Sequence, residues 1–299
     1  MVPSITMNDG FPIETRSLRI FVAVAETGSV SEAARRLHYV QPNVSARITS
    51  LEQEVGARLF DRRSRGMQLT PAGESLLRYA KPVLALVAQA RRVIRDTDHP
   101  EGSLRIGSTD TFASTGLAPL ISGFMKQYPD INIKIETATS RRLNGRLLDH
   151  DIDAAIVEEE RENDHLLFHR LREEPLVLVG RNGEVSDEQQ LNAPLIGFPE
   201  HCPYKTALLD WFAEQGHPTE CSLEIFGLEA VVASVAAGLG TTVLPESVAQ
   251  NYANRLHTLE GSEFTGSVGL YAVCLRDART LPAVQAFIEH ATDFFASPE

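Results

Sequence analysis

The stretch from Ser29 to Thr70 constrains what this chain can fold into more than any other part of the sequence. Ser29 and Glu32 have capping-box spacing, in which the serine oxygen accepts a backbone hydrogen bond and the glutamate carboxylate reaches back, so a helix is predicted to begin here. Apolar residues then recur along one helical face at Val30, Ala33, Ala34 and Leu37. Pro42 suits the first turn of a second helix, where its missing N–H needs no partner. The pattern predicts two short helices joined by a turn.

The second of these helices divides into a core side and a polar side. Its core side is predicted to consist of Val44, Ile48, Leu51 and Val55. In a helix-turn-helix the first turns of the second helix enter the major groove, where hydroxyl, amide and methyl groups contact base edges. The residues predicted to contact DNA from the two helices are Ser31, Gln41, Pro42, Asn43, Ser45, Ala46, Arg47 and Thr49. Arg47 lies at the flank, so we expect a phosphate contact or a local ion pair from it rather than base reading.

A basic turn follows the second helix. Arg62, Arg63 and Arg65 surround Ser64 and end at Gly66. Closely spaced arginines suit DNA phosphates, so this turn is predicted to be a DNA-contacting wing. On spacing alone, a small helical bundle with a solvated arginine loop is the alternative.

Three segments, LRIFVAVAETGSVSEAARRLH, QPNVSARITSLEQEVGARLFDRR and LTPAGE, resemble the N-terminal domain of LysR-type transcriptional regulators. The resemblance implies a winged helix-turn-helix, a linker helix and a two-lobed, periplasmic-binding-protein-like effector domain that binds a small molecule. It also implies homo-oligomers, either dimers or dimers of dimers. Many family members have Arg then Gln after the recognition-helix serine, whereas Ala46 and Arg47 stand here, so the operator sequence is not carried over.

A third helix is predicted to start at Thr70 and Pro71, a cap followed by a first-turn proline. Apolar residues follow at the steps of a coiled-coil seam, at Leu76, Ala80, Val83, Val87, Ala90 and Ile94. We predict that this helix pairs two copies of the chain, which would place two recognition helices about one turn of DNA apart on an inverted-repeat operator. The alternative is an amphipathic helix packed on its own domain. Pro82 predicts a kink near residues 78–82.

The net charge of −12 is unevenly distributed along the chain. Residues 16–95 contain 14 Lys and Arg against 6 Asp and Glu, a balance of +8, which leaves 14 against 34, or −20, for the remainder. A basic head on an acidic body suits DNA contact at one end. Residues 1–15 lack signal-peptide features and no apolar run approaches the roughly 20 residues of a membrane span, so a cytoplasmic protein with no membrane partner and reduced cysteines is predicted.

The C-terminal half alternates predicted strands and helices, which is typical of a parallel α/β sheet. We therefore expect an α/β protein with an all-α winged helix-turn-helix N-terminal domain. The predicted divisions are a loose extension (1–15), the winged domain (16–70), the linker helix (71–96), a hinge (97–103), a first effector lobe (104–172 with 267–299) and a second lobe (173–266). Polar loops at the carboxyl ends of two strands would face the crevice where such sheets bind ligands.

The effector cleft implied by the resemblance combines these loops with residues of the second lobe. The predicted lining is Ser108, Thr109, Asp110, Thr111, Thr139, Glu158, Phe198, Cys202, Tyr204 and Gly227. The stretch from His201 to Lys205 is similar to a family branch that includes a putrescine-utilisation regulator, which implies an amine or amino-acid-derived effector. Asp110 and Glu158 would pair with its cation, although Asp110 equally suits a helix cap. Tyr204 would stack on the ligand or, equally, lie in the core.

Three other functions are weighed against this interpretation. Peroxide-sensing members of the family use a cysteine pair in the second lobe, so a redox role for Cys202 and Cys221 is an alternative to inert thiols. The sequence contains no phosphate-binding glycine loop, metal-ligand spacing or nucleophile elbow, so catalysis, a metal and a cofactor are not predicted. A small-molecule-binding protein would explain the C-terminal half but not the fused DNA-binding head.

Overall fold

The computed structural model describes residues 13–63, 66–95, 100, 102–159, 163–183, 186–199, 201–216, 220–259 and 264–296, with the backbone alone at 62, 63, 88–95 and 280. The chain divides into two compact units, Met1–Ile94 and Arg95–Glu299, which we call the head and the effector domain. Most of the predicted extension (1–15) and most of the predicted hinge (97–103) lie outside the described residues. None of the described helices combines the length and apolar character that a membrane crossing needs.

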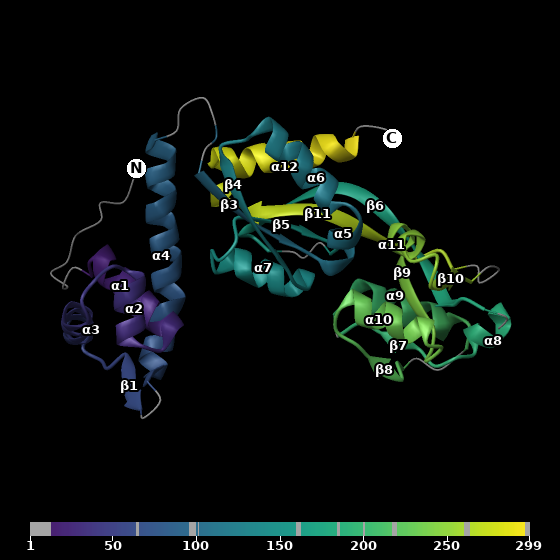
Figure 1. The fold of residues 1–299 in the computed structure, drawn as a ribbon, viewed down its shortest axis with the longest axis horizontal. Helices are drawn as coiled ribbons and strands as arrows, with labels where there is room; N and C mark the ends of the chain where they lie inside the picture. Colours follow the sequence, from purple (N-terminus) through teal and green to yellow (C-terminus); the bar gives the residue numbers. More distant parts are fainter. Residues whose placement is uncertain are drawn as a thin grey trace. The chain divides into compact units, whose positions relative to one another are not determined.

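The head consists of three helices, a hairpin and a long fourth helix (Figure 1). Its elements are α1 (Thr15–Thr27), α2 (Val30–Arg36), α3 (Gln41–Val55), β1 (Phe60–Arg63), β2 (Gly66–Leu69) and α4 (Pro71–Arg95). Gly28 ends α1 with φ of 62°, a left-handed conformation that favours glycine, and donates its N–H to Val24. The antiparallel strands β1 and β2 form the predicted wing.

The expected capping box at the start of α2 is only half present. The Ser29 side chain accepts a hydrogen bond from the Glu32 N–H at 3.4 Å, as predicted. The Glu32 carboxylate does not reach back, because Arg35 on the next turn binds it through two nitrogens. The Ser29 N–H instead donates to the Thr27 hydroxyl oxygen at 3.3 Å. The helix therefore begins where the pattern predicts, through a different set of partners.

The head has its own apolar core, which includes Phe21, Val44 and Leu51. The core face of α1 differs from the predicted one. The apolar residues of 16–27 predict a core face made of Leu18, Phe21, Val22 and Ala25, but Val22 and Ala25 are half-buried while Ile20, Ala23 and Val24 are buried. The strand β2 also packs against α1, so the covered face of this helix is wider than a single stripe.

Helix α4 begins as predicted, with the Thr70 hydroxyl accepting a hydrogen bond from the Gly73 N–H at 3.0 Å. The predicted pairing seam is wrong at Ala80, which is 1% exposed within the head core, and Leu76 is half-buried against that core. The exposed apolar side chains of this helix are instead Tyr79, Val83 and Leu86. The side chains of Ala90 and Ile94 lie outside the description.

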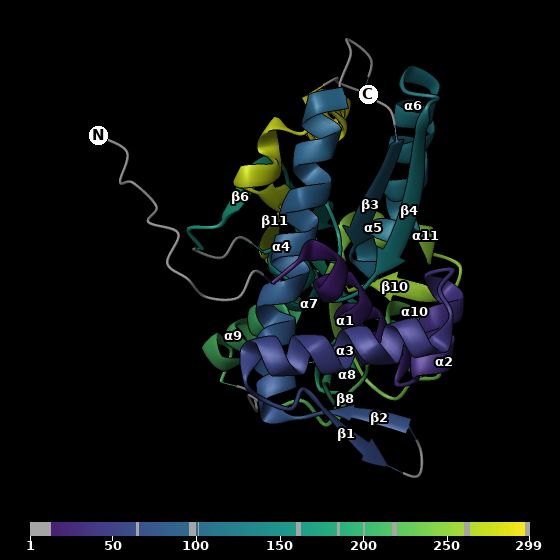
Figure 2. The ribbon, with the colours of Figure 1, turned by 90° about the vertical axis from the view of Figure 1, so that its left-hand side faces the viewer.

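Pro82 lies inside α4. Figures 1 and 2 show the helix continuing through this position without a break, and the predicted bend of its axis near residues 78–82 stays a prediction.

The effector domain is built on one mixed sheet with the strand order β10-β6-β11-β5-β3-β4, and β9 also pairs with β6. The strands are β3 (Gly102–Ser108), β4 (Ile131–Thr137), β5 (Ala154–Val157), β6 (Leu166–Arg181), β9 (Thr242–Pro245), β10 (Leu256–Thr258) and β11 (Ser267–Leu275). Strand β3 pairs in parallel with both β4 and β5, which confirms the predicted parallel arrangement at the start of this domain.

Helices cover both faces of the first lobe. They are α5 (Asp110–Thr115), α6 (Leu117–Gln127), α7 (Ser140–Leu148) and α12 (Pro282–Ala296), with the short 3-10 helix η1 (Asp277–Thr280). Helices α6 and α12 lie on one face of the sheet and α7 on the other (Figure 1). The sequence predicted a polar loop where α5 lies. A helix forms there because the Thr109 hydroxyl accepts a hydrogen bond from the Phe112 N–H at 3.4 Å and so caps it.

The second lobe has a separate apolar core. Its remaining elements are α8 (Asp187–Leu191), β7 (Ile196–Gly197), α9 (Pro203–Glu214), β8 (Leu223–Glu224), α10 (Leu228–Ala236) and α11 (Glu246–Asn251). The lobes share β6, a strand of 16 residues that pairs with β11 from Leu166 to Pro175. The predicted lobe boundary at residues 172–173 therefore falls inside a continuous strand.

Candidate functional site

The exposed side of α2 and α3 holds most of the residues predicted to contact DNA from these helices. Burial of Val44, Ile48 and Leu51 fixes the orientation of α3. Of the eight predicted positions, Ser31, Gln41, Pro42, Asn43, Ala46 and Thr49 are exposed, and Ser45 and Arg47 are half-buried. The Ser31 hydroxyl donates to the Gln41 side-chain oxygen at 3.1 Å, which ties α2 to the first turn of α3.

Arg47 forms the local ion pair that was one of its two predicted roles. Its guanidinium binds the carboxylate of Glu14, just before α1, with the Arg47 side chain 27% exposed. The Nε atom of Arg47 is buried and has no hydrogen-bond partner within the described part of the chain. The other predicted role, a contact with phosphate, therefore competes with an acid that the protein itself supplies.

The wing strands bring Arg62 opposite Met67 and Arg63 opposite Gly66. Side chains of both arginines, and Arg65 as a whole, lie outside the described residues. Their predicted contacts with phosphate stay predictions.

A cavity of about 500 Å³ opens between the two lobes of the effector domain. All of the predicted effector residues except one line it: Thr109, Asp110, Thr111, Thr139, Glu158, Phe198, Cys202, Tyr204 and Gly227. Ser108 does not line the cavity. It is fully buried at the end of β3, and its hydroxyl donates to the Thr109 carbonyl at 3.0 Å.

Sequence reasoning missed several lining residues that the fold brings to the cavity. They are Ala138, Ser140, Arg141, Pro199, His201, Pro203, Glu224, Phe226 and Leu228. Arg141 follows the predicted loop at the start of α7, so a wider window would have included it. Phe226 could have been recognised by its position, because it is a large aromatic residue directly before Gly227. Gly227 has a φ of 88°, which favours glycine, and the chain turns there into α10.

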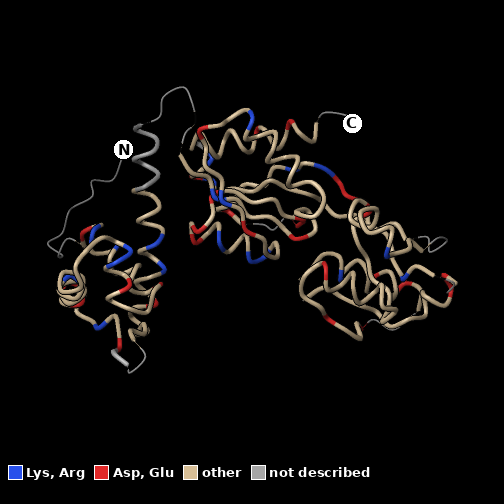
Figure 3. Tube along the Cα trace, in the orientation of Figure 1, with Lys and Arg blue, Asp and Glu red and all other residues tan. Residues whose placement is uncertain are grey.

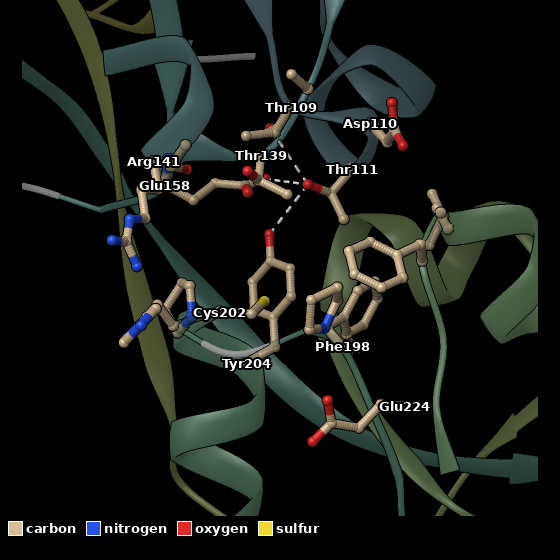
Figure 4. A pocket seen from close by; sticks show the side chains of 18 residues that line it. Thr109, Asp110, Thr111, Thr139, Arg141, Glu158, Phe198, Cys202, Tyr204 and Glu224 are labelled. Carbon is tan, nitrogen blue, oxygen red and sulfur yellow. Dashed lines mark hydrogen bonds between the residues drawn. The ribbon is translucent and has the colours of Figure 1, made fainter. Parts of the chain in front are cut away.

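Glu158 is the centre of the cavity's polar wall. Its side chain follows β5 directly, and the residue is 7% exposed. The Thr111 hydroxyl donates to its carboxyl group, and the Tyr204 hydroxyl donates to the Thr111 hydroxyl oxygen at 3.1 Å (Figure 4). The Thr111 and Thr109 oxygens lie 3.3 Å apart. Because Tyr204 belongs to the second lobe, this cluster joins the two lobes through hydrogen bonds.

The environment of Glu158 favours the uncharged acid. Burial raises its pKa, and hydrogen bonds from Thr111, Tyr204 and Thr109 oppose that shift. Burial likewise raises the pKa of the Tyr204 hydroxyl. Among the residues that the structure describes, no basic side chain forms a salt bridge with Glu158.

The two other residues with open roles are now placed. Asp110 is not the cap of α5, which is Thr109, but an exposed residue of its first turn, and Figure 4 shows its carboxylate apart from the Glu158 cluster. Tyr204 lies in the core of the second lobe, where it is 2% exposed and its ring packs edge-on against Phe198 at 5.4 Å between centroids, and the residue also lines the cavity. Its predicted stacking on a ligand stays a prediction.

The thiols offer little support for redox chemistry. Burial raises the pKa of Cys202 to about 12 and also raises that of Cys221, so both stay protonated at neutral pH, whereas the thiolate is the reactive form. The described residues contain no cluster of three or more His, Cys, Asp and Glu side chains suited to a metal ion.

Charge is unevenly placed around the cavity. The described lining includes three acidic residues, Asp110, Glu158 and Glu224, and one arginine, Arg141. Glu224 is paired with Lys205. Figure 3 shows further basic residues along α7, where Arg146 pairs with Glu136 at 2.9 Å. The cavity thus joins an acidic wall to aromatic rings, a combination that suits cations.

Two family models match the chain. One described as "Bacterial regulatory helix-turn-helix protein, lysR family" matches residues 15–74, and one described as "LysR substrate binding domain" matches residues 97–296. The chain is 37% identical over 243 residues to the HTH-type transcriptional regulator YofA of Bacillus subtilis, covering 81% of this chain and 85% of that protein. It is 32% identical over 279 residues to the HTH-type transcriptional regulator CzcR of Bacillus cereus, covering 93% and 96%.

Solved structures agree in fold. The crystal structure of CbnR, a LysR family transcriptional regulator, matches with a TM-score of 0.70 at 22% identity, covering 96% of this chain and all of that one. A full-length OxyR variant from Pseudomonas aeruginosa matches with a TM-score of 0.71 at 23% identity, covering 95% of each chain.

Proposed function

The chain belongs to the LysR family of transcriptional regulators, and from this premise we propose that a small cation held between its lobes controls how paired heads bind an operator. It is a DNA-binding regulator with an N-terminal helix-turn-helix and a C-terminal substrate-binding domain. Because bacterial operators lie in the cytoplasm, this is where the protein would act.

In this proposal, the exposed polar residues of α3 read base edges and the wing arginines bind phosphates. Asn43 and Thr49 are exposed on the helix that enters the groove. Replacing Arg63 with alanine should weaken binding to all DNA sequences alike and flatten the salt dependence of the affinity. A change in base preference instead would mean that Arg63 does not serve as a phosphate contact.

Two copies of the chain would pair through α4 on an inverted-repeat operator. The exposed apolar residues Tyr79, Val83 and Leu86 recur at steps of four and three along this helix, the period of a helix-pairing seam. Dimers, or dimers of dimers, would then set the distance between two recognition helices. Sedimentation of a Val83→Asp variant, compared with Met125→Asp on the effector domain, tests this seam. A Val83→Asp protein that keeps the wild-type mass would contradict it.

The effector would be an amine or an amino-acid-derived cation. The acidic and aromatic lining of the cavity carries this proposal, because carboxylates pair with ammonium groups and aromatic faces attract them. Phe226, which is 77% exposed at the cavity lining, is free to cover a bound cation. The resemblance of residues 201–205 to a putrescine-utilisation regulator makes a diamine the first candidate.

Binding would act by a population shift. An effector that prefers one lobe arrangement stabilises it by the difference in its affinity for the two arrangements, and this changes the spacing of paired heads. Thermal unfolding of the full chain should reveal the effector, since ligand at about a hundred times its dissociation constant stabilises by roughly 2.7 kcal/mol.

The matching test on DNA is a footprint of an operator, with and without saturating 1,4-diaminobutane. A changed footprint or bend is expected. An amine that stabilises the protein but leaves the footprint unchanged would contradict the proposed coupling. Stabilisation by organic acids and not by amines would contradict the cationic class.

A further inference from the structure

Resting on the proposed cationic effector, we infer that the cation binds in exchange for the proton of Glu158, so that occupancy of the cavity releases one proton. The proposal goes beyond the class of ligand. The buried side chain of Glu158 would select a charged ligand over an uncharged one of the same shape.

Geometry is the first support. Glu158 is 7% exposed, and its carboxyl group contacts hydroxyls where a buried acid would ordinarily contact a cation. Moving a carboxylate out of water without a paired charge costs free energy, so a buried acid of this kind usually stays protonated. The carboxyl group nevertheless lines a cavity with room for a small molecule. The missing positive charge can therefore come from a ligand.

Among the residues that the structure describes, the charged and titratable groups around Glu158 do not supply that charge. From α9 and the residue before it come Tyr204 and Cys202, whose raised pKa values keep both uncharged. The neighbouring Glu159 and, on β6, Glu174 oppose a further negative charge at Glu158. Glu174 is itself paired with Arg172.

The remaining groups lie in the cavity lining, on α5, at α7 and before α9. They are Asp110, Arg141, His201 and, on β8, Glu224, and all four are exposed; Glu224 is paired with Lys205. Solvent screens exposed charges strongly, so Arg141 is a weak substitute for a cation in contact with the buried oxygen atoms.

The exchange itself involves no covalent change in the ligand. An ammonium group enters with its charge, the O–H bond of the Glu158 carboxyl group breaks, and the proton passes to the solvent buffer. The carboxylate then accepts hydrogen bonds from the ammonium group and from Thr111. Hydrogen bonds to a charged acceptor are about twice as strong as those between neutral groups, so the existing hydroxyl cluster favours the ligand-bound form.

Two measurable consequences distinguish this exchange from ordinary charge pairing. Below the pKa of Glu158 in the ligand-free protein, the affinity for an amine should rise about tenfold for each unit of pH, because each binding event releases one proton. An uncharged molecule of the same length should bind weakly and release no proton.

Calorimetric titration of the full chain tests both consequences. The probes are 1,4-diaminobutane, butylamine and the uncharged 1,4-butanediol, each titrated from pH 5 to 8 in two buffers with different heats of ionisation. At a pH below the pKa of Glu158 we expect release of about one proton per bound amine, and a smaller release as the pH rises above it. Glu158→Gln should bind the amines at least tenfold more weakly and without proton release. Glu246→Gln, an exposed acid outside the cavity lining, should behave like the wild type.

The outcomes separate the two proposals. Amine binding without proton release, at an affinity independent of pH, would overturn the exchange while leaving the cationic effector in place. Amine binding that survives in Glu158→Gln with its proton release unchanged would assign the exchange to another group. If neither amine binds at millimolar concentration, both proposals fail. Equal melting temperatures of the variants confirm that a loss of binding does not reflect unfolding.

Discussion

The strand β5 has a buried acid at each end, and the two are stabilised in different ways. Asp153, just before the strand, accepts hydrogen bonds from the Arg105 backbone N–H at 2.9 Å and from its guanidinium at 2.9 and 3.0 Å. Glu158, just after the strand, contacts hydroxyls. Four residues lie between an acid that the protein neutralises itself and one that, among the described residues, has hydroxyls rather than a basic side chain as partners.

The partners of these two acids distinguish a structural role from a functional one better than their burial does. Both acids are 7% exposed, so exposure alone would class them together. Asp153 faces β3 on the side away from the cavity, where its partner is fixed by the strand pairing. Glu158 lines the cavity. Asp153, with its full set of partners, supports the fold, whereas Glu158, which contacts hydroxyls and lines the cavity, is the acid that we propose meets a ligand.

Replacing Asp153 with asparagine should have the largest effect on stability. Removing one partner of a buried ion pair costs about 3–5 kcal/mol, and the figure here should be nearer 2–3 because the Arg105 side chain is 37% exposed. Urea unfolding at pH 7 measures the loss. The control is Asp151→Asn, whose carboxylate lies 3.9 Å from Arg146 at a 31% exposed position and should cost less than about 1 kcal/mol. Equal losses would remove the contrast with Glu158.

At Glu158 the expected effect depends on pH. The stability of the wild-type protein relative to a Glu158→Gln variant should fall as the pH rises. Its folded pKa lies above the unfolded value of about 4.3, so the folded state holds more protons. The advantage is complete below about pH 4.3 and declines by up to about 1.4 kcal/mol per unit as pH rises toward the folded pKa. Urea midpoints of wild type and Glu158→Gln from pH 4 to 8 test this. A constant difference would mean that burial does not disfavour the charged form.

Replacing Tyr204 with phenylalanine tests how much a single hydroxyl of the Glu158 cluster contributes to stability. The variant loses the hydrogen bond to Thr111 between the lobes but keeps the ring packing against Phe198, so we expect a loss of about 0.5–1.5 kcal/mol. Tyr128→Phe, which removes a hydroxyl that accepts an exposed hydrogen bond from Gln127 within the first lobe, should cost less. If both variants are equally stable, the hydroxyl cluster does not hold the lobes together.

The smallest effect on stability is expected in the head. There the charge of Arg47 is paired with Glu14, an acid of the protein itself. Glu14 is 59% exposed, so Glu14→Gln should change stability by no more than about 0.5 kcal/mol. Freed from this competitor, Arg47 should bind phosphate better, raising affinity for all DNA sequences by a few-fold and steepening the salt dependence. Filter binding at several salt concentrations measures this. An unchanged salt slope would show that Arg47 does not contact phosphate.

Local patterns allowed the helix-turn-helix to be predicted from the sequence. Periodic apolar residues and the glycine and threonine caps act over a few residues, so α2, α3 and the start of α4 lie where they were expected. The same patterns do not tell which surface a helix covers. The repeat through Leu76 and Ala80 suited a second copy of the chain, but the head core takes both side chains.

The first half of β6 was not predicted from the sequence, because charged residues interrupt its apolar pattern. Arg170 pairs with Glu173, and Arg172 pairs with Glu174, so side chains that suggest a loop are neutralised within the strand. For the cavity, the rule that ligands bind at the carboxyl ends of parallel strands placed Thr109, Thr111 and Glu158 correctly. His201 and Phe226 depend on how the second lobe faces the first, which no local pattern encodes.

The return of the chain through β11 and α12 has a consequence for how the protein is made. The core of the first lobe includes Phe287 and Ala291, near the end of the chain, beside Leu104 and Ile106, which follow the head closely. On the ribosome, the head can fold as soon as it emerges, while the first lobe must wait until the second has been synthesised and β11 is available. A nascent chain stalled after β10 should therefore hold a protease-resistant head followed by a first lobe that proteases still cleave.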